Sequence, residues 1–378
     1  MDSLDAQPPF RGLADRTPMV SICVPTYNGA RFLSQCLDAA LAQTWSDFEL
    51  IIVDDRSTDR TLEIAAAYAA RDSRIKLHQN DRNLGLAGNW NHCVHLSRGQ
   101  WIKFLFQDDL LEPTCLSRML AVRRPDVPLI VVRRALDMGP DTPEKLKLLY
   151  QWHATLMLRH LFPGVSFVNP GDFAARVVKQ PTNNCIGEPT ATLIHRSAFD
   201  RFGLFNPNFK VLTDWEFHAR IAVHQGLCYV DDELATFRVH SKSTTQTELA
   251  RSSFRTVELD ALIMLHELAY SATFEPVREA ARRRHALDLS FYLAREVRRT
   301  HRKAKRSAGT RGQPGSEALA ELAALIRTYP RLAKTPRGYL RAIASEFLRH
   351  ARWDLMRRTE SLLSMFSPMI RAGRAGCL

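Results

Sequence analysis

The sequence predicts an α/β protein whose core is a doubly wound, mostly parallel sheet, with a helical extension at its C-terminal end. Two short apolar runs, Ile51 to Val53 and Ile102 to Phe106, are typical of buried parallel strands, and each is followed closely by a pair of aspartates. Amphipathic helical segments alternate with such runs, which predicts right-handed βαβ crossovers. Because open α/β sheets bind ligands at the carboxyl ends of their strands, the aspartates predict a site for a metal ion and a nucleotide.

The elements alternate in the order that this fold requires. They are a strand at 20–24, a helix from Phe32 to Leu41, a strand at 48–53, a helix beginning near Leu62, a strand at 75–78, a helix at 90–96 and a strand at 102–106. Pro25 to Gly29 has the turn chemistry that ends the first strand, and Asp59 is a candidate N-cap for the second helix. Residues 80–88 are rich in Asn and Gly, which predicts a loop there.

Length and charge predict one large domain and a basic appendage. The chain has 378 residues, 45% of them hydrophobic and 24% charged, as expected of a globular protein. Residues 251–378 carry 25 Lys and Arg against 12 Asp and Glu, so they hold the whole excess behind the net charge of +12. We therefore divide the chain into an N-terminal tail at 1–17, an α/β domain at 18–250 and a basic helical region at 251–378, with a linker near 307–316.

Cysteine usage and hydropathy predict the compartment. Seven cysteines are scattered without a CxxC pair, which argues against a disulfide framework or a zinc site and for a reducing compartment. No apolar stretch reaches the ~18 residues that cross a bilayer, and the N-terminal residues lack a secretory charge pattern. We expect a cytoplasmic protein that does not span a membrane.

Ordered motifs across residues 18–245 match one known family. They are Val24-Pro25-Thr26-Tyr27-Asn28, Gln43 to Asp55, Ser57, Asp59, Thr61, Asn83, Gly85, Asn89, Gly99, Phe104 to Asp109, Glu188-Pro189-Thr190, Arg196, Gly203, Phe205, Thr213-Asp214-Trp215 and Phe237 to His240. In these the chain resembles the family 2 glycosyltransferases of the GT-A fold, of the type that makes bacterial polysaccharides and lipid-linked glycans. The resemblance implies an inverting, metal-dependent transfer of a sugar from a nucleotide-diphosphate donor, with a UDP-sugar favoured, to a glycan or lipid-linked acceptor.

The resemblance assigns the nucleotide to residues that follow the first three strands. It implies that Asp55 bonds the edge of the base, that Tyr27 stacks on the base, and that Pro25 adds main-chain contacts. Arg82, in the loop at 80–88, would meet the base or the diphosphate. Taken alone, an aspartate after a strand more often belongs to a turn or a helix cap, and Arg82 could equally be a solvated loop charge.

Asp108 and Asp109 occupy the position of the family's DxD-type metal motif. A divalent cation, Mg²⁺ or Mn²⁺, held there by carboxylate oxygen would stabilise the diphosphate leaving group. Many relatives have Asp-x-Asp-Asp, whereas this chain has Phe106 and Gln107 before the two aspartates. We assign Asp109 to the metal and Asp108 to the ribose or a position outside the direct ligands. Two exposed loop acids without an ion are the alternative.

Asp214 is the predicted catalytic base. In an inverting transfer the acceptor hydroxyl loses its proton as it attacks the anomeric carbon, and a positioned carboxylate can accept that proton. Relatives usually have Glu-Asp at this point, whereas this chain has Thr213-Asp214, so the aspartate is kept and its acidic neighbour is lost. The alternative is an N-cap for a helix at 215–223, and Asp214 could serve as both.

Arg238 and His240 resemble the Arg-x-His that closes the metal–diphosphate site in many relatives. His240 would bind the metal, and Arg238 would hold phosphate through a forked pair of hydrogen bonds, although a lone histidine is more often structural. Glu188, in the Gly187-Glu188-Pro189 turn, is expected to face the acceptor or the donor sugar. The sequence leaves open whether the segment at 141–182, inserted between the two halves, shapes the acceptor site.

The C-terminal third is predicted to be helical. One helix carries an apolar stripe from Val257 to Leu268, and a second begins at Pro276 and ends in the basic run 301–306. Further on, apolar residues from Leu340 to Phe366 share one helical face while arginines fall elsewhere. Such a helix could lie on an anionic membrane, here the inner face of the cell membrane, or dock on the α/β domain, and the sequence leaves both open.

Two other function classes compete with sugar transfer. One is a nucleotidyltransferase or another nucleotide-sugar-binding protein on a related sheet. A nucleotidyltransferase would want a Gly-rich, Lys-bearing phosphate loop after the first strand, and Pro25 to Asn28 is not one. The other class, nucleic-acid binding, is suggested only by the basic C-terminal third, which has few aromatics among its charges. We therefore expect no nucleic-acid partner.

Overall fold

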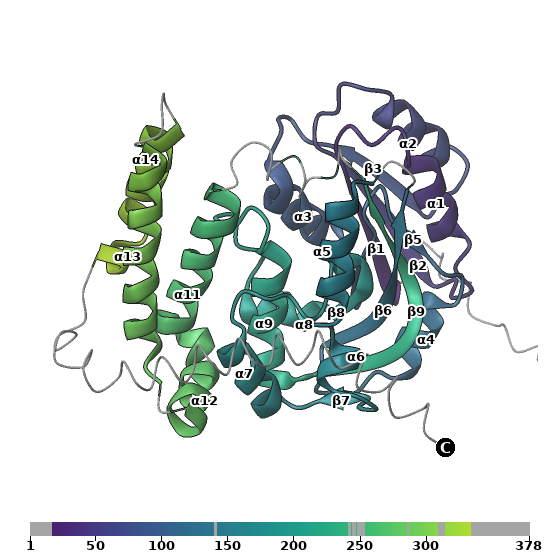
Figure 1. Ribbon diagram of the computed structural model, residues 1–378. Helices are drawn as coiled ribbons and strands as arrows, with labels where there is room; N and C mark the ends of the chain where they lie inside the picture. Colours follow the sequence, from purple (N-terminus) through teal and green to yellow (C-terminus); the bar gives the residue numbers. More distant parts are fainter. Residues whose placement is uncertain are drawn as a thin grey trace, which may run out of the picture.

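A computed structural model of the chain describes residues 17–139, 142–240, 243, 247, 254–285, 287–308 and 314–333. Within these residues, nine strands form one sheet that has helices on both faces (Figure 1). The strands are β1 (Val20–Thr26), β2 (Phe48–Asp54), β3 (Ile75–Gln79), β4 (Trp101–Phe104), β5 (Leu110–Leu111), β6 (Leu129–Met138), β7 (Phe167–Val168), β8 (Thr192–His195) and β9 (Leu227–Val239). The helices are α1 (Leu33–Leu41), α2 (Thr61–Ala69), α3 (Gly85–Leu96), α4 (Cys115–Ala121), α5 (Glu144–Ala154), α6 (Leu158–Leu161), α7 (Pro170–Lys179), α8 (Arg196–Phe202), α9 (Thr213–Gln225), α11 (Asp260–Tyr270), α12 (Glu275–His285), α13 (Leu289–Ala308) and α14 (Pro314–Thr328).

The sheet has a parallel half and a mixed half. Its strand order is β3-β2-β1-β4-β8-β6-β9-β5, with β7 paired to β9. The first four strands are parallel, and β8 is antiparallel to both of its neighbours. Most paired residues belong to parallel ladders, which confirms the predicted fold class. Because Thr26 of β1 pairs with Asp54 of β2, the loops that follow these strands leave the same edge of the sheet.

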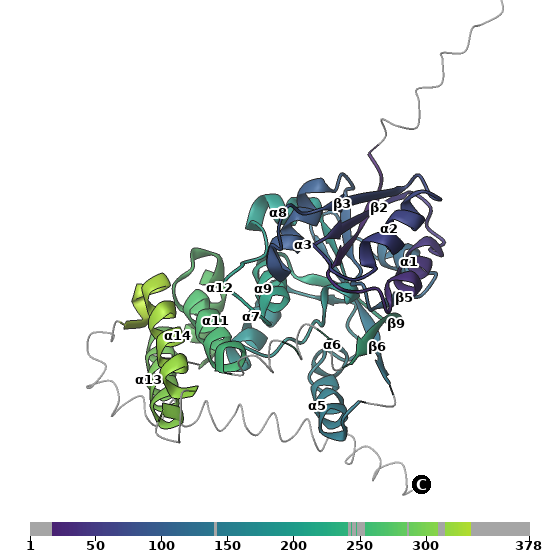
Figure 2. The same ribbon diagram turned by 90° about the horizontal axis from the view of Figure 1, so that it is seen from above.

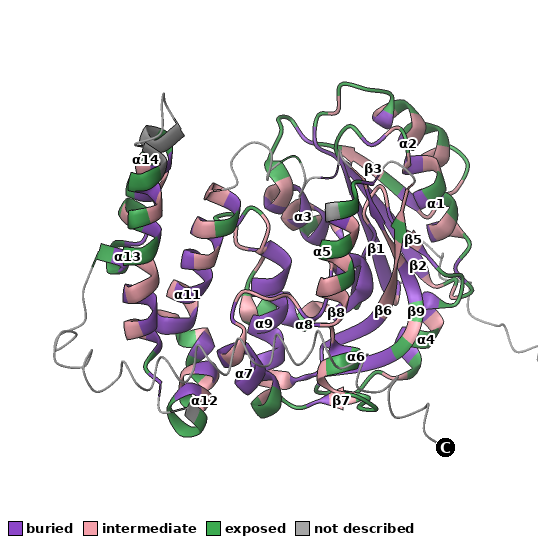
Figure 3. Cartoon of the chain, viewed as in Figure 1, coloured by how far each residue is buried: buried purple, intermediate pink, exposed green. Residues whose placement is uncertain are grey.

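Each face of the sheet has its own apolar core, and the inner residues of β1 alternate between the two. Ile22 and Val24 pack into the core beneath α1 and α4, whereas Cys23 faces the core beneath α3 and α9. This second core continues into α11–α14, with Phe274 and Leu322 among its members, and these helices lie on the α9 side of the sheet (Figures 2 and 3). The boundary predicted near residue 250 therefore separates two parts of the chain that share one core.

The prediction of one continuous helix from Pro276 to the basic run 301–306 is wrong. The structure has two helices there, α12 and α13, separated by a short break. Asp288 accounts for the break, because its carboxylate accepts hydrogen bonds from the main-chain N–H and the hydroxyl of Ser290 and so caps the start of α13. The predicted stripe is buried at Met264 and Leu268, but Val257 is exposed.

Some sequence predictions lie outside the described residues. They are the N-terminal tail, residues 309–313 of the linker near 307–316 and the amphipathic stripe from Leu340 to Phe366. Among the helices that the structure does describe, none combines the length and the apolar character needed to cross a bilayer.

Candidate active site

The loops that follow β1 and β2 are bonded to each other at the carboxyl edge of the sheet. The main-chain N–H of Asn28 donates to Ser57 Oγ at 2.9 Å, and the N–H of Thr58 donates to Asn28 Oδ1 at 2.8 Å. Asn28 and Arg56 have φ values of +50° and +64°, in the left-handed region that non-glycine residues seldom adopt. The turn is closed by Asp54, whose Oδ2 accepts from the N–H of Ser57 at 3.1 Å. Together the two loops form a fixed ledge at the predicted nucleotide site.

Asp55 is 2% exposed and anchors the start of α3. Its Oδ1 accepts hydrogen bonds from Asn80 Nδ2 and the N–H of Leu84, both at 2.7 Å, and its Oδ2 accepts from the N–H of Gly85 at 3.0 Å. The capping alternative is therefore real, but it acts on α3 and not on the helix that follows Asp55 in sequence. Its contact with a base stays a prediction.

Tyr27 is held at the surface by Gln107, a residue that the sequence argument did not assign to the site. The Gln107 amide accepts from the Tyr27 N–H at 2.9 Å and donates to the Tyr27 carbonyl at 3.1 Å, while the tyrosine itself is 49% exposed. A side chain at Gly29 would collide with this amide, since a Cβ there would lie 2.1 Å from Gln107 Oε1. Pro25 is buried at the end of β1, and Arg82 is exposed on the loop before α3.

The two aspartates of the predicted metal motif have different environments. Asp109 is completely buried, and it accepts hydrogen bonds from Thr190 Oγ1 at 2.6 Å and from the N–H of Arg238 at 3.1 Å. Burial and, after it, the charge of Asp108 raise the pKa of Asp109 well above its usual range. Asp108 is partly exposed, and its Oδ2 lies 2.9 Å from His240 Nε2. Phe106, at the first position of the motif, stacks on Trp90 and so belongs to the core.

Arg238 and His240 both lie against Phe32 and both carry an unsatisfied nitrogen. Arg238 Nε pairs with Asp137 at 2.9 Å, and the guanidinium lies 4.5 Å above the Phe32 ring. Among the described residues, Arg238 Nη1 and His240 Nδ1 have no hydrogen-bond partner although they are buried. An imidazole, the carboxylate of Asp108 and a free guanidinium nitrogen suit a divalent cation with its diphosphate. The described residues contain no cluster of three or more metal-binding side chains, so a cation there would need ligands from elsewhere.

Asp214 is the second residue of α9, because the helix begins at Thr213. The N-cap alternative is therefore wrong, and its carboxylate lies within the first turn. Asp214 is 9% exposed, and its Oδ2 accepts from Asn184 Nδ2 at 3.2 Å. Burial first, and then the charge of Glu188, raise the pKa of Asp214 to about 7. A carboxylate with this pKa is suited to accept a proton near neutral pH.

Glu188 is near both the metal motif and the predicted base, since its charge contributes to the raised pKa of Asp109 and of Asp214. It forms a double hydrogen bond with the guanidinium of Arg134, with both side chains largely buried. Tyr150 of α5 belongs to this cluster, since burial and Glu188 raise its pKa. The inserted segment at 141–182 therefore brings α5 close to Glu188 and Arg134.

The sequence argument missed Arg134, Asn184 and Tyr150. Arg134 had a visible signal, because two arginines interrupt an otherwise apolar strand after Val132. Asn184 and Tyr150 had none, since each reaches the site from a loop or an insertion with no motif of its own.

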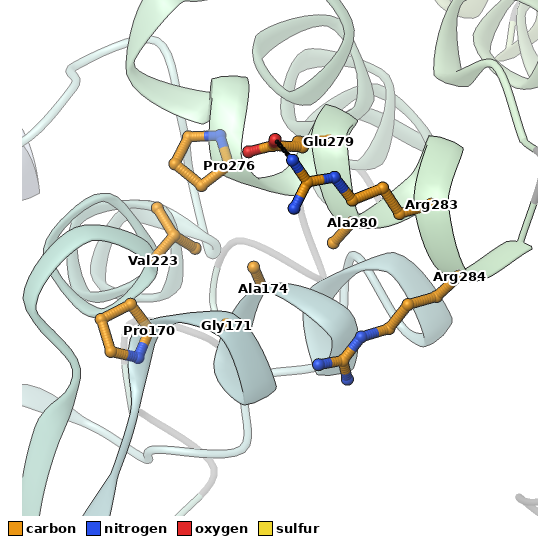
Figure 4. Close-up of a pocket in the computed structure, with 9 residues that line it drawn as sticks. All are labelled: Pro170, Gly171, Ala174, Val223, Pro276, Glu279, Ala280, Arg283 and Arg284. Carbon is orange, nitrogen blue, oxygen red and sulfur yellow. Dashed lines mark ion pairs between the residues drawn. The ribbon is translucent and has the colours of Figure 1, made fainter.

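A separate shallow cavity of about 210 Å³ lies between α7, α9 and α12 (Figure 4). Its walls are largely apolar, with Val223 and Pro276 among them, and Arg284 lies at its edge. It contains none of the site residues predicted from the sequence. The strand ends, and not this cavity, define the candidate active site.

Comparison with known proteins identifies the family. The model described as "Glycosyl transferase family 2" matches residues 21–203. The chain is 30% identical over 247 residues to a PGL/p-HBAD biosynthesis glycosyltransferase of Mycobacterium bovis (strain BCG / Pasteur 1173P2), covering 65% of this chain and 83% of the relative. The chain belongs to glycosyltransferase family 2. The predicted enzyme class, a sugar transferase of EC 2.4, is thereby confirmed.

Other relatives share the domain or the fold. Chondroitin synthase of Escherichia coli is 38% identical over 117 residues, which are 31% of this chain and 17% of that protein. The crystal structure of S. aureus TarS 1–349 in complex with UDP-GlcNAc superposes with a TM-score of 0.53 at 16% identity, covering 92% of both chains. At this identity the superposition shows a common fold.

The raised pKa of Asp214 predicts how the enzyme responds to pH. Only the ionised carboxylate can accept a proton, so we expect kcat to rise with pH until about 7 and then level off. The folded state keeps a proton that the unfolded chain loses, so the same group should lower stability as pH rises from about 4 to about 7. Release of nucleoside diphosphate across this range measures the first effect. If kcat of the wild type instead rises near pH 4 and is level above it, the prediction is contradicted.

Proposed function

We propose that the protein is an inverting, metal-dependent glycosyltransferase that moves a sugar from a UDP-sugar or a related nucleotide-diphosphate donor to a glycan or lipid-linked acceptor. The observation that most supports this proposal is the environment of Asp214. An inverting transfer needs one carboxylate that removes the proton of the attacking hydroxyl, and Asp214 is nearly buried with a pKa raised to about 7. Asn184 orients this carboxylate, and the paired Glu188 and Arg134 lie beside it.

We propose that Asp108 and His240 meet the divalent cation, Mg²⁺ or Mn²⁺, and that Asp109 holds the surrounding loops in place. The sequence argument gave the direct role to Asp109. However, Asp109 is completely buried, and its oxygens accept hydrogen bonds from Thr190 and the Arg238 main chain, whereas Asp108 is partly exposed beside His240. The cation would neutralise the charge that develops on the diphosphate as the sugar leaves.

The nucleotide assignments remain as the family resemblance gives them. The exposed ring of Tyr27 is free to stack on a base, and the exposed Arg82 can reach the base or the diphosphate. Asp55 Oδ2 accepts one hydrogen bond, from Gly85, and a carboxylate oxygen can accept a second one from the base. Pro25, next to the last residue of β1, lies beside this ledge, where its main chain can contact the base.

A donor screen tests the proposal. Purified protein would be incubated with Mn²⁺ and each of a panel of nucleotide sugars, and free nucleoside diphosphate would be measured. Slow release from one donor that accelerates with a glycan or lipid-linked acceptor supports transfer, and the anomeric configuration of the product by NMR tests inversion. Release of pyrophosphate in a parallel assay with a nucleoside triphosphate and a sugar 1-phosphate would instead indicate a nucleotidyltransferase.

We also propose a cytoplasmic location with peripheral attachment to the inner face of the cell membrane through the basic C-terminal region. Truncation before Gly338 should reduce sedimentation with anionic vesicles and leave donor hydrolysis intact, because α11–α14 and all the candidate site residues precede it. Salt should weaken the binding of the full-length protein, since surface charges are screened within ~8 Å at physiological ionic strength. Neutral vesicles serve as the control. A full-length protein that ignores anionic vesicles at low salt would overturn this proposal.

A further inference from the structure

Asp260, the first residue of α11, reaches across to the loop in front of α9. Its side chain is completely buried, and a single oxygen, Oδ2, accepts three main-chain hydrogen bonds. The donors are the N–H groups of Lys210, Val211 and Leu212, at 2.9, 2.7 and 3.2 Å. A carboxylate from the C-terminal helices therefore accepts hydrogen bonds from three consecutive main-chain amides of the α/β domain.

Arg255 completes this contact from the π-helical turn Phe254–Leu259. Its Nη1 donates to the second oxygen of Asp260 at 2.6 Å, and its Nη2 donates to the carbonyl of Asn208 at 2.5 Å. Hydrogen bonds between charged groups are about twice as strong as neutral ones. The loop 208–212 is thus held at both ends by one ion pair from the C-terminal region.

The contact matters because α9 has no cap of its own. Leu212 occupies the N-cap position, and an apolar side chain cannot accept a hydrogen bond from the first turn. The negative charge of Asp260 lies beside the positive end of the helix, where an anion is stabilising. The first turn that follows carries Asp214, two residues beyond the last amide that Asp260 binds.

We propose that Asp260 is a positioning residue for the catalytic base. By fixing residues 210–212 it fixes the first turn of α9 and keeps the carboxylate of Asp214 buried beside Asn184. The C-terminal helices then help to position an active-site residue, in addition to sharing an apolar core with the α/β domain. This inference rests on the proposed function, since it takes Asp214 as the base.

The Asp260→Asn variant tests the inference, because it keeps the shape of the side chain and removes its charge. The loop should loosen, and kcat should fall about tenfold to a hundredfold, since small misplacements of a catalytic group have effects of this size. The affinity for UDP, by calorimetry, should not change. The acidic limb of the kcat profile should also move to lower pH, because water would reach Asp214 and reduce the effect of burial on its pKa. Its charged neighbours among the described residues are Glu188 and Arg134.

Glu258→Gln is the matched control. Glu258 lies two residues from Asp260 but pairs with Lys303 of α13, so its loss should leave kcat and the pH limb unchanged. All measurements are made well below each melting temperature, with the folded fraction checked by circular dichroism. If Asp260→Asn does not fold, Arg255→Gln replaces it, with a smaller effect in the same direction.

The inference fails if the folded variant keeps the wild-type kcat and pH limb, or if UDP affinity falls as much as kcat. The proposed function fails separately, if Asp214→Asn itself has normal turnover. If Asp260→Asn and Asp214→Asn each lower kcat, the results support both the inference about Asp260 and the proposed function.

Discussion

Asp214→Asn is expected to lower turnover by ~10²–10⁴-fold, the usual effect of removing a general base. The substitution keeps the size of the side chain and an oxygen for the main-chain N–H of Trp215. It costs the hydrogen bond from Asn184, because the Oδ1 of Asn184 is already held by the N–H groups of Ile186 and Gly187 and the amide cannot turn over. One such bond contributes about 1 kcal/mol, so the variant should still fold.

Two readouts separate a lost base from a damaged site. UDP affinity should match that of the wild type, because the proposed function assigns Asp214 to the acceptor and not to the nucleotide. The acidic limb of the pH profile should vanish along with the activity. Asp200→Asn, an exposed carboxylate on α8, is the control and should behave as the wild type. Normal turnover in Asp214→Asn would leave Asp214 with a structural role at the start of α9.

Strands β1, β2 and β4 could be predicted to within two residues because they are buried on both faces. The strand expected at 48–53 is Phe48–Asp54, and the one expected at 20–24 is Val20–Thr26. The run expected at 102–106 is Trp101–Phe104, and it contains the completely buried Lys103. The ammonium of this lysine donates to the main-chain carbonyls of Thr190, in the turn before β8, and of Thr192, the first residue of β8, which no local pattern of the sequence indicates.

Motifs predicted which side chains gather at the strand ends, but not how each is held. The structure confirms that Asp108 and His240, 132 residues apart, are neighbours. It also shows that both carboxylate oxygens of Asp109 accept hydrogen bonds from distant parts of the chain. These bonds depend on the register of β9 and on the turn that carries Thr190. Contacts of this kind are set by tertiary packing between distant segments, so the sequence could name the carboxylates without ranking them.

Asp108→Asn is expected to abolish the stimulation of turnover by Mn²⁺ and to weaken the binding of UDP in the presence of the cation. Asp108 is partly exposed and His240 Nδ1 has no hydrogen-bond partner among the described residues, whereas Asp109 is completely buried with a hydrogen bond to each of its oxygens. Neutralising the leaving diphosphate contributes several kcal/mol, and about 1.4 kcal/mol corresponds to tenfold in rate. A loss of at least a hundredfold follows, with little change in melting temperature.

Asp109→Asn provides the comparison that separates the two aspartates. The buried carboxylate joins the loop after β4 to Thr190 and to the main chain of β9. Its replacement should therefore lower the melting temperature clearly and have little effect on the response to Mn²⁺. Calorimetry of UDP with and without Mn²⁺ gives each variant a reading that does not depend on turnover. If only Asp109→Asn loses the response to Mn²⁺, then Asp109, and not Asp108, binds the cation directly. Undiminished wild-type activity in EDTA would remove the metal from the reaction altogether, and Arg238 and Arg82 would then be the charged partners proposed for the diphosphate.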